Sequence, residues 1–178
     1  MRVLVPADHF ATAAAVRLAA TNDGPFYIRM GRFPVPEFYD KGFVGGIPFA
    51  NVVREGSDLT ICACGIEVSM AYKAAERLAR EGISAEVIDV FSVKPLAEDV
   101  ICASAAKTGL VLTAEEHSVL GGMGSAVAEL LSEQCPTRIG YVGMRGFGTS
   151  APGDVLLKHH GLEEEGVYQA AKELLKQK

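Results

Sequence analysis

Residues 110–131 read LVLTAEEHSVLGGMGSAVAELL, and this stretch decides which fold we expect. It opens with an apolar run at residues 110–112, which is too short for a helix and suits a buried strand. Three ionisable residues and a glycine-rich bend follow. Apolar residues recur at helical spacing after Ser125, so we expect a helix there with Ser125 as its N-cap. This order predicts a ligand or partner site outside the carboxyl end of a strand in an α/β sheet.

The second part of the chain, residues 49–178, alternates between strand-like and helix-like patterns. A short turn at residues 55–58 predicts a hairpin whose two strands run antiparallel. The later strands alternate with helices, which predicts parallel strands joined by right-handed crossovers, with helices on both faces. We therefore expect a three-layer α/β/α domain with a mixed, mostly parallel five-stranded sheet. The expected strands are residues 50–53, 59–64, 85–90, 110–113 and 138–142, and the expected helices begin after Gly65, at residues 94–96, after Ser125, at Asp154 and at Glu164.

The first part of the chain, residues 1–32, has the pattern of a single β-α-β unit. Asp8 is a good N-cap for a helix from His9 to about Ala20, and short apolar runs at 3–5 and 26–28 flank it. Two strands cannot bury both faces of a sheet, so this unit is either the remnant of a second α/β domain or a piece whose sheet another subunit completes. Residues 33–48 are rich in proline, glycine and aromatic residues, and we expect them to form a connector that lies on a surface.

Composition excludes several classes of protein. The chain has 178 residues, of which 49% are hydrophobic, so it can bury a core. Its formal net charge of −5 argues against nucleic-acid binding. No apolar run reaches the roughly 18 to 20 residues of a membrane span. The start resembles neither a signal nor a transit peptide, so we expect a cytoplasmic protein with four reduced cysteines and no metal site.

The triplet Glu115, Glu116 and His117 has two interpretations. It could be an acid–base cluster, since neighbouring carboxylates raise one another's pKa and histidine titrates near neutrality. Consecutive residues at a strand end point in different directions, however, so at most two of the three share a site. Alternatively, one carboxylate accepts backbone N–H groups of the following turn and fixes it.

Gly121, Gly122 and Gly124 precede a helix, where backbone amides could bind phosphate. The spacing matches neither a dinucleotide-binding fingerprint nor a P-loop, and the adjacent glutamates would repel an anion. Tight packing of strand against helix is the favoured interpretation. Arg29 and Arg32, which follow the second strand, indicate either a ligand or interface site or two solvated arginines.

The stretch TAEEHSVLGGMGSAVAELL resembles the C-terminal domain of transketolases, in which an E-E/D-H triplet precedes G-G-x-G-S-A-V-A-E. GPFYIRMGR is similar to the end of the pyrimidine-binding domain, and residues 52–99 and 146–175 resemble the hairpin with the first β-α-β unit and the closing segment. The resemblance best fits the smaller subunit of a split transketolase, or a truncated fragment. His117 favours transketolase over 1-deoxyxylulose-5-phosphate synthases, which usually carry Asn there. Residues 143–150 lack an Asp that the family usually has.

The resemblance implies thiamine diphosphate chemistry with Mg²⁺ in the complete enzyme, which passes a two-carbon ketol unit between sugar phosphates. The diphosphate motif and the activating glutamate of the family have no counterpart here, so this chain alone is expected to bind no cofactor and to be inactive. Its expected partners are an N-terminal transketolase section or subunit and further copies of itself. Arg32 matches the family arginine that binds the sugar phosphate, and Arg29 is a weaker candidate. The residues expected to form a structural or interface motif, rather than a catalytic one, are Glu115, Glu116, His117, Gly121, Gly122 and Gly124.

Other functions stay open at this point. The chain could be a non-catalytic dimerisation or docking module with the same fold. It could also be the equivalent part of a 1-deoxyxylulose-5-phosphate synthase or of a 2-oxo-acid dehydrogenase β subunit. A free-standing nucleotide-binding domain would need the glycine turn to hold phosphate.

Overall fold

A computed structural model describes residues 1–32 and 34–177. Phe33 and Lys178, at the start of the expected connector and the end of the expected second domain, lie outside this description. The elements are β1 (Arg2–Leu4), α1 (His9–Thr21), β2 (Phe26–Ile28), β3 (Asn51–Arg54), β4 (Leu59–Ala63), α2 (Glu67–Arg80), β5 (Ala85–Asp89), β6 (Ser92–Lys94), α3 (Glu98–Thr108), β7 (Leu110–Ser118), α4 (Met123–Gln134), β8 (Arg138–Met144), α5 (Gly153–His159) and α6 (Glu164–Leu175).

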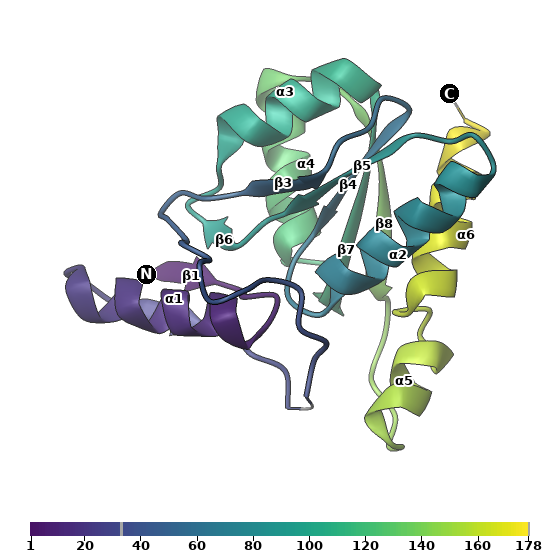
Figure 1. Ribbon diagram of the computed structural model, residues 1–178. Helices are drawn as coiled ribbons and strands as arrows, with labels where there is room; N and C mark the ends of the chain where they lie inside the picture. Colours follow the sequence, from purple (N-terminus) through teal and green to yellow (C-terminus); the bar gives the residue numbers. More distant parts are fainter. Residues whose placement is uncertain (33, 178) are drawn as a thin grey trace.

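The main sheet has five strands in the order β3-β5-β4-β7-β8, and only β3 runs antiparallel to its neighbour. Helices α2 and α6 pack on one face of this sheet, and α3 and α4 pack on the other (Figure 1). All five residues of β4 and of β5 are buried, as expected for strands covered on both faces. The expected three-layer fold with a mixed, mostly parallel sheet is confirmed.

Strand β3 does not pair with β4, so the expected hairpin is wrong. β3 is antiparallel to β4 in direction, but β5 lies between them. The reason lies in the turn, which crosses the amino end of β5, where the backbone N–H groups of Ser57 and Asp58 donate to the Ser84 carbonyl. A Cβ atom on Gly56 would overlap the backbone there, at 2.7 Å from the Ala85 carbonyl oxygen. Glycine therefore lets the turn pass close over β5.

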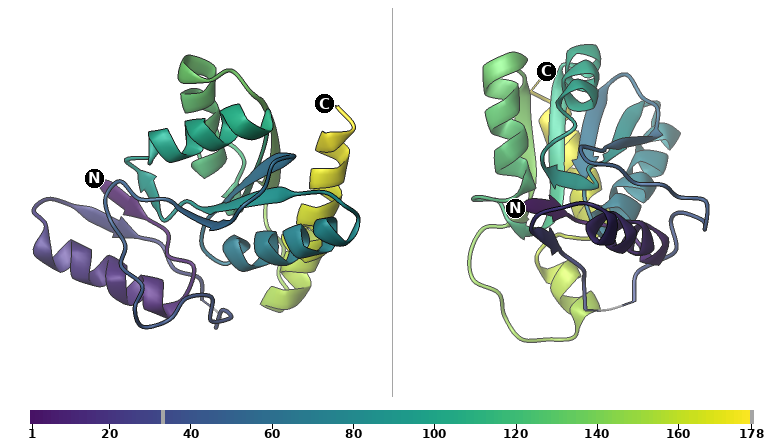
Figure 2. Two further views of the ribbon diagram at one scale, coloured as in Figure 1. Left: turned by 45° about the horizontal axis from the view of Figure 1, so that its top comes forward. Right: turned by 90° about the vertical axis from the view of Figure 1, so that its left-hand side faces the viewer.

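The β1-α1-β2 unit forms as expected, with β1 parallel to β2. The Asp8 carboxylate caps α1 by accepting the Ala11 N–H at 2.8 Å. The small sheet also includes β6, which pairs antiparallel with the other edge of β1 and was not expected. The helix expected at residues 94–96 begins only at Glu98, because residues 92–94 are drawn into this pairing. Figure 2 shows the β1-α1-β2 unit against the end of the main sheet.

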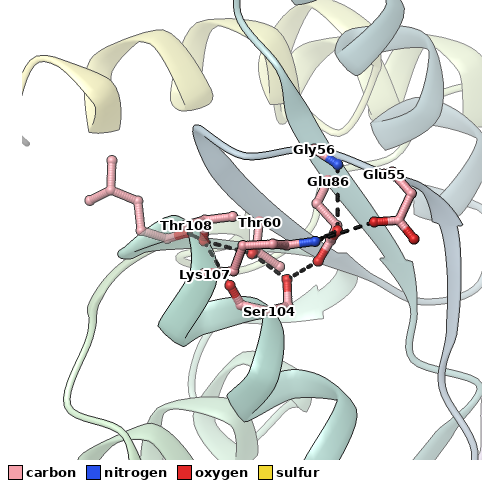
Figure 3. Close-up of polar contacts among 8 residues, drawn as sticks. Glu55, Gly56, Thr60, Glu86, Ser104, Lys107 and Thr108 are labelled. Carbon is pink, nitrogen blue, oxygen red and sulfur yellow. Dashed lines mark hydrogen bonds and ion pairs between the residues drawn. The ribbon is translucent and has the colours of Figure 1, made fainter.

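The amino ends of β4 and β5 are joined by a buried polar network (Figure 3). Thr60 and Glu86 are register partners, and the Glu86 carboxylate accepts hydrogen bonds from Ser104 and from Lys107, both on α3. The Thr60 and Thr108 hydroxyls lie 2.8 Å apart. Burial opposes ionisation of Glu86, but the hydrogen bonds from Lys107 and Ser104 outweigh it and hold the pKa of this carboxyl below its usual value. The network ties α3 to the sheet at the end opposite to the carboxyl ends of the strands.

No helix among residues 1–32 and 34–177 is long and apolar enough to cross a membrane. Within the same residues, no three histidine, cysteine, aspartate or glutamate side chains are grouped so that they could hold a metal ion. All four cysteines are free thiols, and Cys62 and Cys64 are buried.

Candidate functional site

The carboxyl ends of β4 and β7 form the point at which the strand order reverses. The chain passes from β4 to β5 on one side, and then to β7 on the other. Helices α2 and α4 begin next to this point, which is where ligands usually bind in α/β sheets. Here the β1-α1-β2 unit covers it, and the Gly65 N–H donates to the Val5 carbonyl at 3.3 Å. The candidate site is therefore the junction between this unit and the main sheet.

Glu115 fixes the start of α4. Its carboxylate is 3% exposed and accepts the Met123 N–H at 2.7 Å and the Gly124 N–H at 2.8 Å. These hydrogen bonds are charge-assisted, and they place the negative carboxylate at the positive end of the helix dipole, which stabilises it. The expected N-cap at Ser125 is wrong, since α4 already begins at Met123 and the Ser125 hydroxyl accepts the Gly121 N–H instead. Two of the backbone amides that a phosphate would need are occupied by Glu115.

The glycines of this turn allow the close approach of Glu115. A Cβ atom on Gly122 would lie 2.6 Å from Glu115 Oε1, and one on Gly124 would lie 2.7 Å from Thr113 Oγ1. Gly121 has a φ of +74°, in the left-handed region that favours glycine. These contacts explain the glycine-rich bend as packing of strand against helix.

The triplet does not converge on one point, because β7 continues through Ser118 and its residues alternate in direction. Glu115 is buried, Glu116 is half-buried against Arg29, and His117 is exposed, with Nδ1 3.1 Å from the Ser118 carbonyl oxygen. An acid–base cluster of all three residues does not form.

The two arginines have different environments. The Arg29 guanidinium donates to the Glu116 carbonyl oxygen and lies 3.4 Å from Glu116 Oε2, and its side chain is only 24% exposed. Arg32 is exposed and, within the described residues, makes no hydrogen bond or ion pair.

Arg32 lines a cavity of about 890 Å³ between the first unit and the main domain. This volume suits a small molecule, and its wall is mostly apolar with a few polar groups. The polar side chains from the first unit include His9 and Thr12, and those from the main domain include Thr149 and His160. The structure thus places both Arg29 and Arg32, but not the glycine turn, on this cavity.

Two buried carboxyl groups near the junction were not predicted. Glu67 begins α2 and is fully buried, and neither of its carboxyl oxygens has a hydrogen-bond partner among the described residues. Burial raises its pKa to about 8, with a further rise from Glu116 and a partial offset from Arg29. The only signal in the sequence was a glutamate at a helix start, which usually means an exposed residue.

Asp89 ends β5 and is also fully buried. It accepts the Tyr39 hydroxyl at 2.7 Å, while its other oxygen has no partner among the residues described. Burial raises its pKa to about 7, the Tyr39 hydrogen bond lowers it in part, and Asp8 raises it. A single acidic residue at the end of an apolar strand gave no sign of this environment.

These two carboxyls are expected to make the chain less stable as the pH rises. Both have a folded-state pKa above the usual unfolded values of about 4, so the unfolded chain releases their protons first. Their contribution to the free energy of unfolding is fully present below about pH 4 and is lost as the pH rises through about 8.

The Glu67→Gln substitution removes one of these groups. The stability of this variant should therefore fall less than that of the wild type as the pH rises from about 4 to about 8. Urea denaturation between about pH 5 and 9 should show a relative loss of several kcal/mol for the wild type, since each pKa unit corresponds to about 1.4 kcal/mol. Glu76→Gln, at an exposed position on α2, is the matched control. Parallel curves for wild type and Glu67→Gln would show that the Glu67 pKa is not raised.

Comparison with known proteins identifies the family. Residues 49–167 match the family model described as transketolase, C-terminal domain. The chain is 42% identical, over its whole length, to the 6-deoxy-6-sulfo-D-fructose transketolase subunit of Clostridium sp. (strain MSTE9), of which it covers 56%. It is 36% identical, over 99% of its length, to an apulose-4-phosphate transketolase subunit of Phocaeicola vulgatus, of which it covers 57%.

A solved structure described as a split gene transketolase, inactive beta4 tetramer, matches with a TM-score of 0.96 and 43% identity. That match covers 99% of this chain and 58% of the other chain. The chain thus spans little more than half the length of the first relatives that it matches. From these matches and the fold, the chain belongs to the transketolase family, and it carries the family's C-terminal domain.

Proposed function

We propose that this chain is the C-terminal part of a transketolase-type enzyme that transfers a two-carbon ketol unit between sugar phosphates. The observation that carries the proposal is the similarity of the whole chain to transketolase subunits, of which it spans just over half. The rest of the enzyme is expected to come from an N-terminal section or subunit, in an assembly that contains further copies of this chain.

The described residues do not form a metal site by themselves. Magnesium prefers several oxygen ligands, and no group of three acidic, histidine or cysteine side chains is suitably placed within the described ranges. The two unpartnered carboxyls, on Glu67 and Asp89, are buried and do not line the cavity at Arg32. We therefore propose thiamine diphosphate and Mg²⁺ for the complete enzyme only, with the metal ligands outside these residues.

The proposed task of this chain is to bind the sugar phosphate. Arg32 supports this task because its exposed guanidinium lies on the cavity at the junction. A planar guanidinium can donate two parallel hydrogen bonds to a phosphate and remains charged at every physiological pH. The apolar part of the wall would limit the access of water.

Reconstitution tests the proposal. The chain is mixed with a polypeptide that supplies the N-terminal, thiamine diphosphate-binding part, and transfer from a ketose phosphate to an aldose phosphate is measured. We expect activity in the mixture and none with either component alone. Calorimetric titration of this chain alone with thiamine diphosphate and Mg²⁺ should show no binding. Tight binding by this chain alone, or a correctly assembled but inactive complex, would contradict the proposal.

A non-catalytic docking module is the second candidate. Two large apolar side chains favour it, because Phe147 is 99% exposed and Leu120 is 80% exposed. Such residues often mark interaction surfaces when they are grouped. Under this alternative, the assembly forms but loss of Arg32 changes no kinetic constant.

A further inference from the structure

Two of the four cysteines lie together where helices α3 and α4 pack. Cys102 belongs to α3, Cys135 is the C-cap of α4, and both helices cover the same face of the main sheet (Figure 1). Both residues are free thiols and half-buried, whereas Cys62 and Cys64 are buried. Reagents in solution can therefore reach Cys102 and Cys135 but not the other two thiols of the folded chain.

The Cys135 side chain points toward Cys102. Its Sγ lies 3.7 Å from the Cys102 carbonyl oxygen, to which the thiol donates a weak hydrogen bond. A carbonyl oxygen lies about 2.4 Å from the Cα atom of its own residue, so the Cys135 sulfur lies within about 6 Å of Cys102 Cα. A disulfide requires about 4 Å between these two atoms. Side-chain rotation and a small shift of the end of α4 can close the difference.

The surroundings of the two thiols bring their sulfurs together. Both side chains pack against one apolar cluster, between the main sheet and helices α3 and α4. Burial raises the pKa of the Cys102 thiol, and a charge on Cys135 raises it next, ahead of Glu98 and Asp99. Cys102 therefore stays a neutral thiol near pH 7, and its reaction depends on a sulfur that is already held beside it.

The segments that carry the two thiols are tied to each other. The Gln134 side-chain amide donates to the Glu98 carboxylate at 2.8 Å, which links the last residue of α4 to the first residue of α3. The Thr137 hydroxyl donates to the Cys135 carbonyl oxygen at 2.8 Å and fixes the turn after α4. These contacts give the two thiols a high effective concentration toward each other.

We propose that Cys102 and Cys135 form a dithiol site, which small disulfides such as oxidised glutathione convert into a disulfide bond between α3 and the end of α4. One thiolate of the pair attacks the small disulfide, so that a mixed disulfide forms on the protein and one glutathione thiolate leaves. The second thiol then loses its proton and attacks the protein sulfur of the mixed disulfide, which releases the second glutathione.

The reaction is balanced without a further reactant. The two protein thiols lose two electrons, oxidised glutathione gains them, and the two protons pass to the released thiolates. The free thiols of the structure are the reduced state of this site. The proposal concerns a face of the domain that does not line the cavity at Arg32, and it does not depend on the proposed ketol transfer.

Oxidation of the full chain under native conditions tests the proposal. The chain is incubated with oxidised glutathione, alkylated, and analysed by mass spectrometry intact and as peptides. We expect an intact mass about 2 Da below that of the reduced chain and a cross-linked peptide pair that contains Cys102 and Cys135. Cys102→Ser and Cys135→Ser should each abolish this bond, whereas the matched control Cys62→Ala should retain it. A bond between other cysteines, or mixed disulfides alone, would overturn the proposal.

Phenylarsine oxide supplies a second readout, because its arsenic atom binds two neighbouring thiols and releases one water. Wild type and Cys62→Ala should bind one equivalent that resists a monothiol wash, and neither serine variant should do so. The disulfide should also raise Tm by about 5–10 °C, reversibly with dithiothreitol, because it joins residues 33 positions apart and restricts the unfolded chain. An unchanged or lower Tm of the oxidised chain would show that the native geometry does not accommodate the bond, and the proposal would be wrong.

Discussion

An Arg32→Ala variant of the assembled enzyme is expected to lose about 100-fold in kcat/KM for phosphorylated acceptors. The physical reason is the loss of charge-assisted hydrogen bonds to phosphate, which are each worth roughly 1.5–3 kcal/mol, while about 2.7 kcal/mol corresponds to 100-fold. Arg32 is exposed and has no other partner among the described residues, so the substitution should leave stability unchanged. Steady-state kinetics with a phosphorylated and an unphosphorylated acceptor of the same chain length measure the effect.

The selectivity of this loss separates phosphate binding from a general defect. Arg32→Ala should reduce use of the phosphorylated acceptor only, and Arg32→Lys should recover a part, because a lysine keeps the charge but not the planar fork. Arg17→Ala removes an exposed arginine from the same unit and should change neither substrate's kinetics. An equal loss for both acceptors would contradict the assignment of Arg32 to phosphate. Full activity with both would instead favour the docking module.

Glu86→Ala is expected to lower the free energy of unfolding by about 1–3 kcal/mol, which is the usual cost of leaving a buried hydrogen-bond partner unsatisfied, because Lys107 is partly exposed and keeps its contact with Glu55. Glu86 is 1% exposed and accepts hydrogen bonds from Ser104 and Lys107. Its loss leaves the Ser104 hydroxyl without its acidic acceptor and opens a cavity beneath α3. Urea denaturation monitored by circular dichroism measures the change.

Two variants make the Glu86 result specific. Glu86→Gln keeps the shape and one acceptor, so it should cost clearly less than alanine. Glu76→Ala, at an exposed position on α2, should change stability by less than about 0.5 kcal/mol. If Glu86→Ala is no more destabilising than Glu76→Ala, the network in Figure 3 does not stabilise the fold. The pKa of Glu86 is held low, so its contribution is present above about pH 4 and is lost as the pH falls through its folded value.

The two ends of the main sheet therefore differ in how their buried carboxyl groups are partnered. At the amino end, Glu86 is fully provided with partners and ties α3 to β4 and β5. At the carboxyl end, Glu67 and Asp89 are buried, and three of their four carboxyl oxygens have no partner among the described residues. Buried polar groups without partners lower stability, and proteins usually tolerate this cost at functional sites.

Several elements could be predicted from sequence because their causes are local. Asp8 caps α1 through an amide three residues away, and Gly109 ends α3 with a φ of +72°. The nearly continuous apolar run of β5 marks a strand covered on both faces. In each case the deciding residues lie within one turn or one strand of each other.

The errors came from contacts between distant segments. Nothing within residues 92–94 indicates a strand, because β6 exists only through its pairing with β1. The start of α4 is set by a carboxylate eight residues earlier, on a neighbouring strand. The second oxygen of Asp8 accepts the backbone N–H groups of Phe38 and Tyr39, and so fixes the connector as well as the helix.

The sequence by itself determined the α/β class, the order of most helices and strands, the family resemblance and the two arginines of interest. Only the tertiary structure decided that β5 separates β3 from β4, that Glu115 is the carboxylate of the triplet that holds the glycine turn, and that Arg29 is bound to Glu116 while Arg32 stays exposed. Helical periodicity, caps and apolar runs depend on neighbouring residues. Burial, pKa and the choice of ion-pair partner depend on which segments meet, and Arg29 meets a residue 87 positions away.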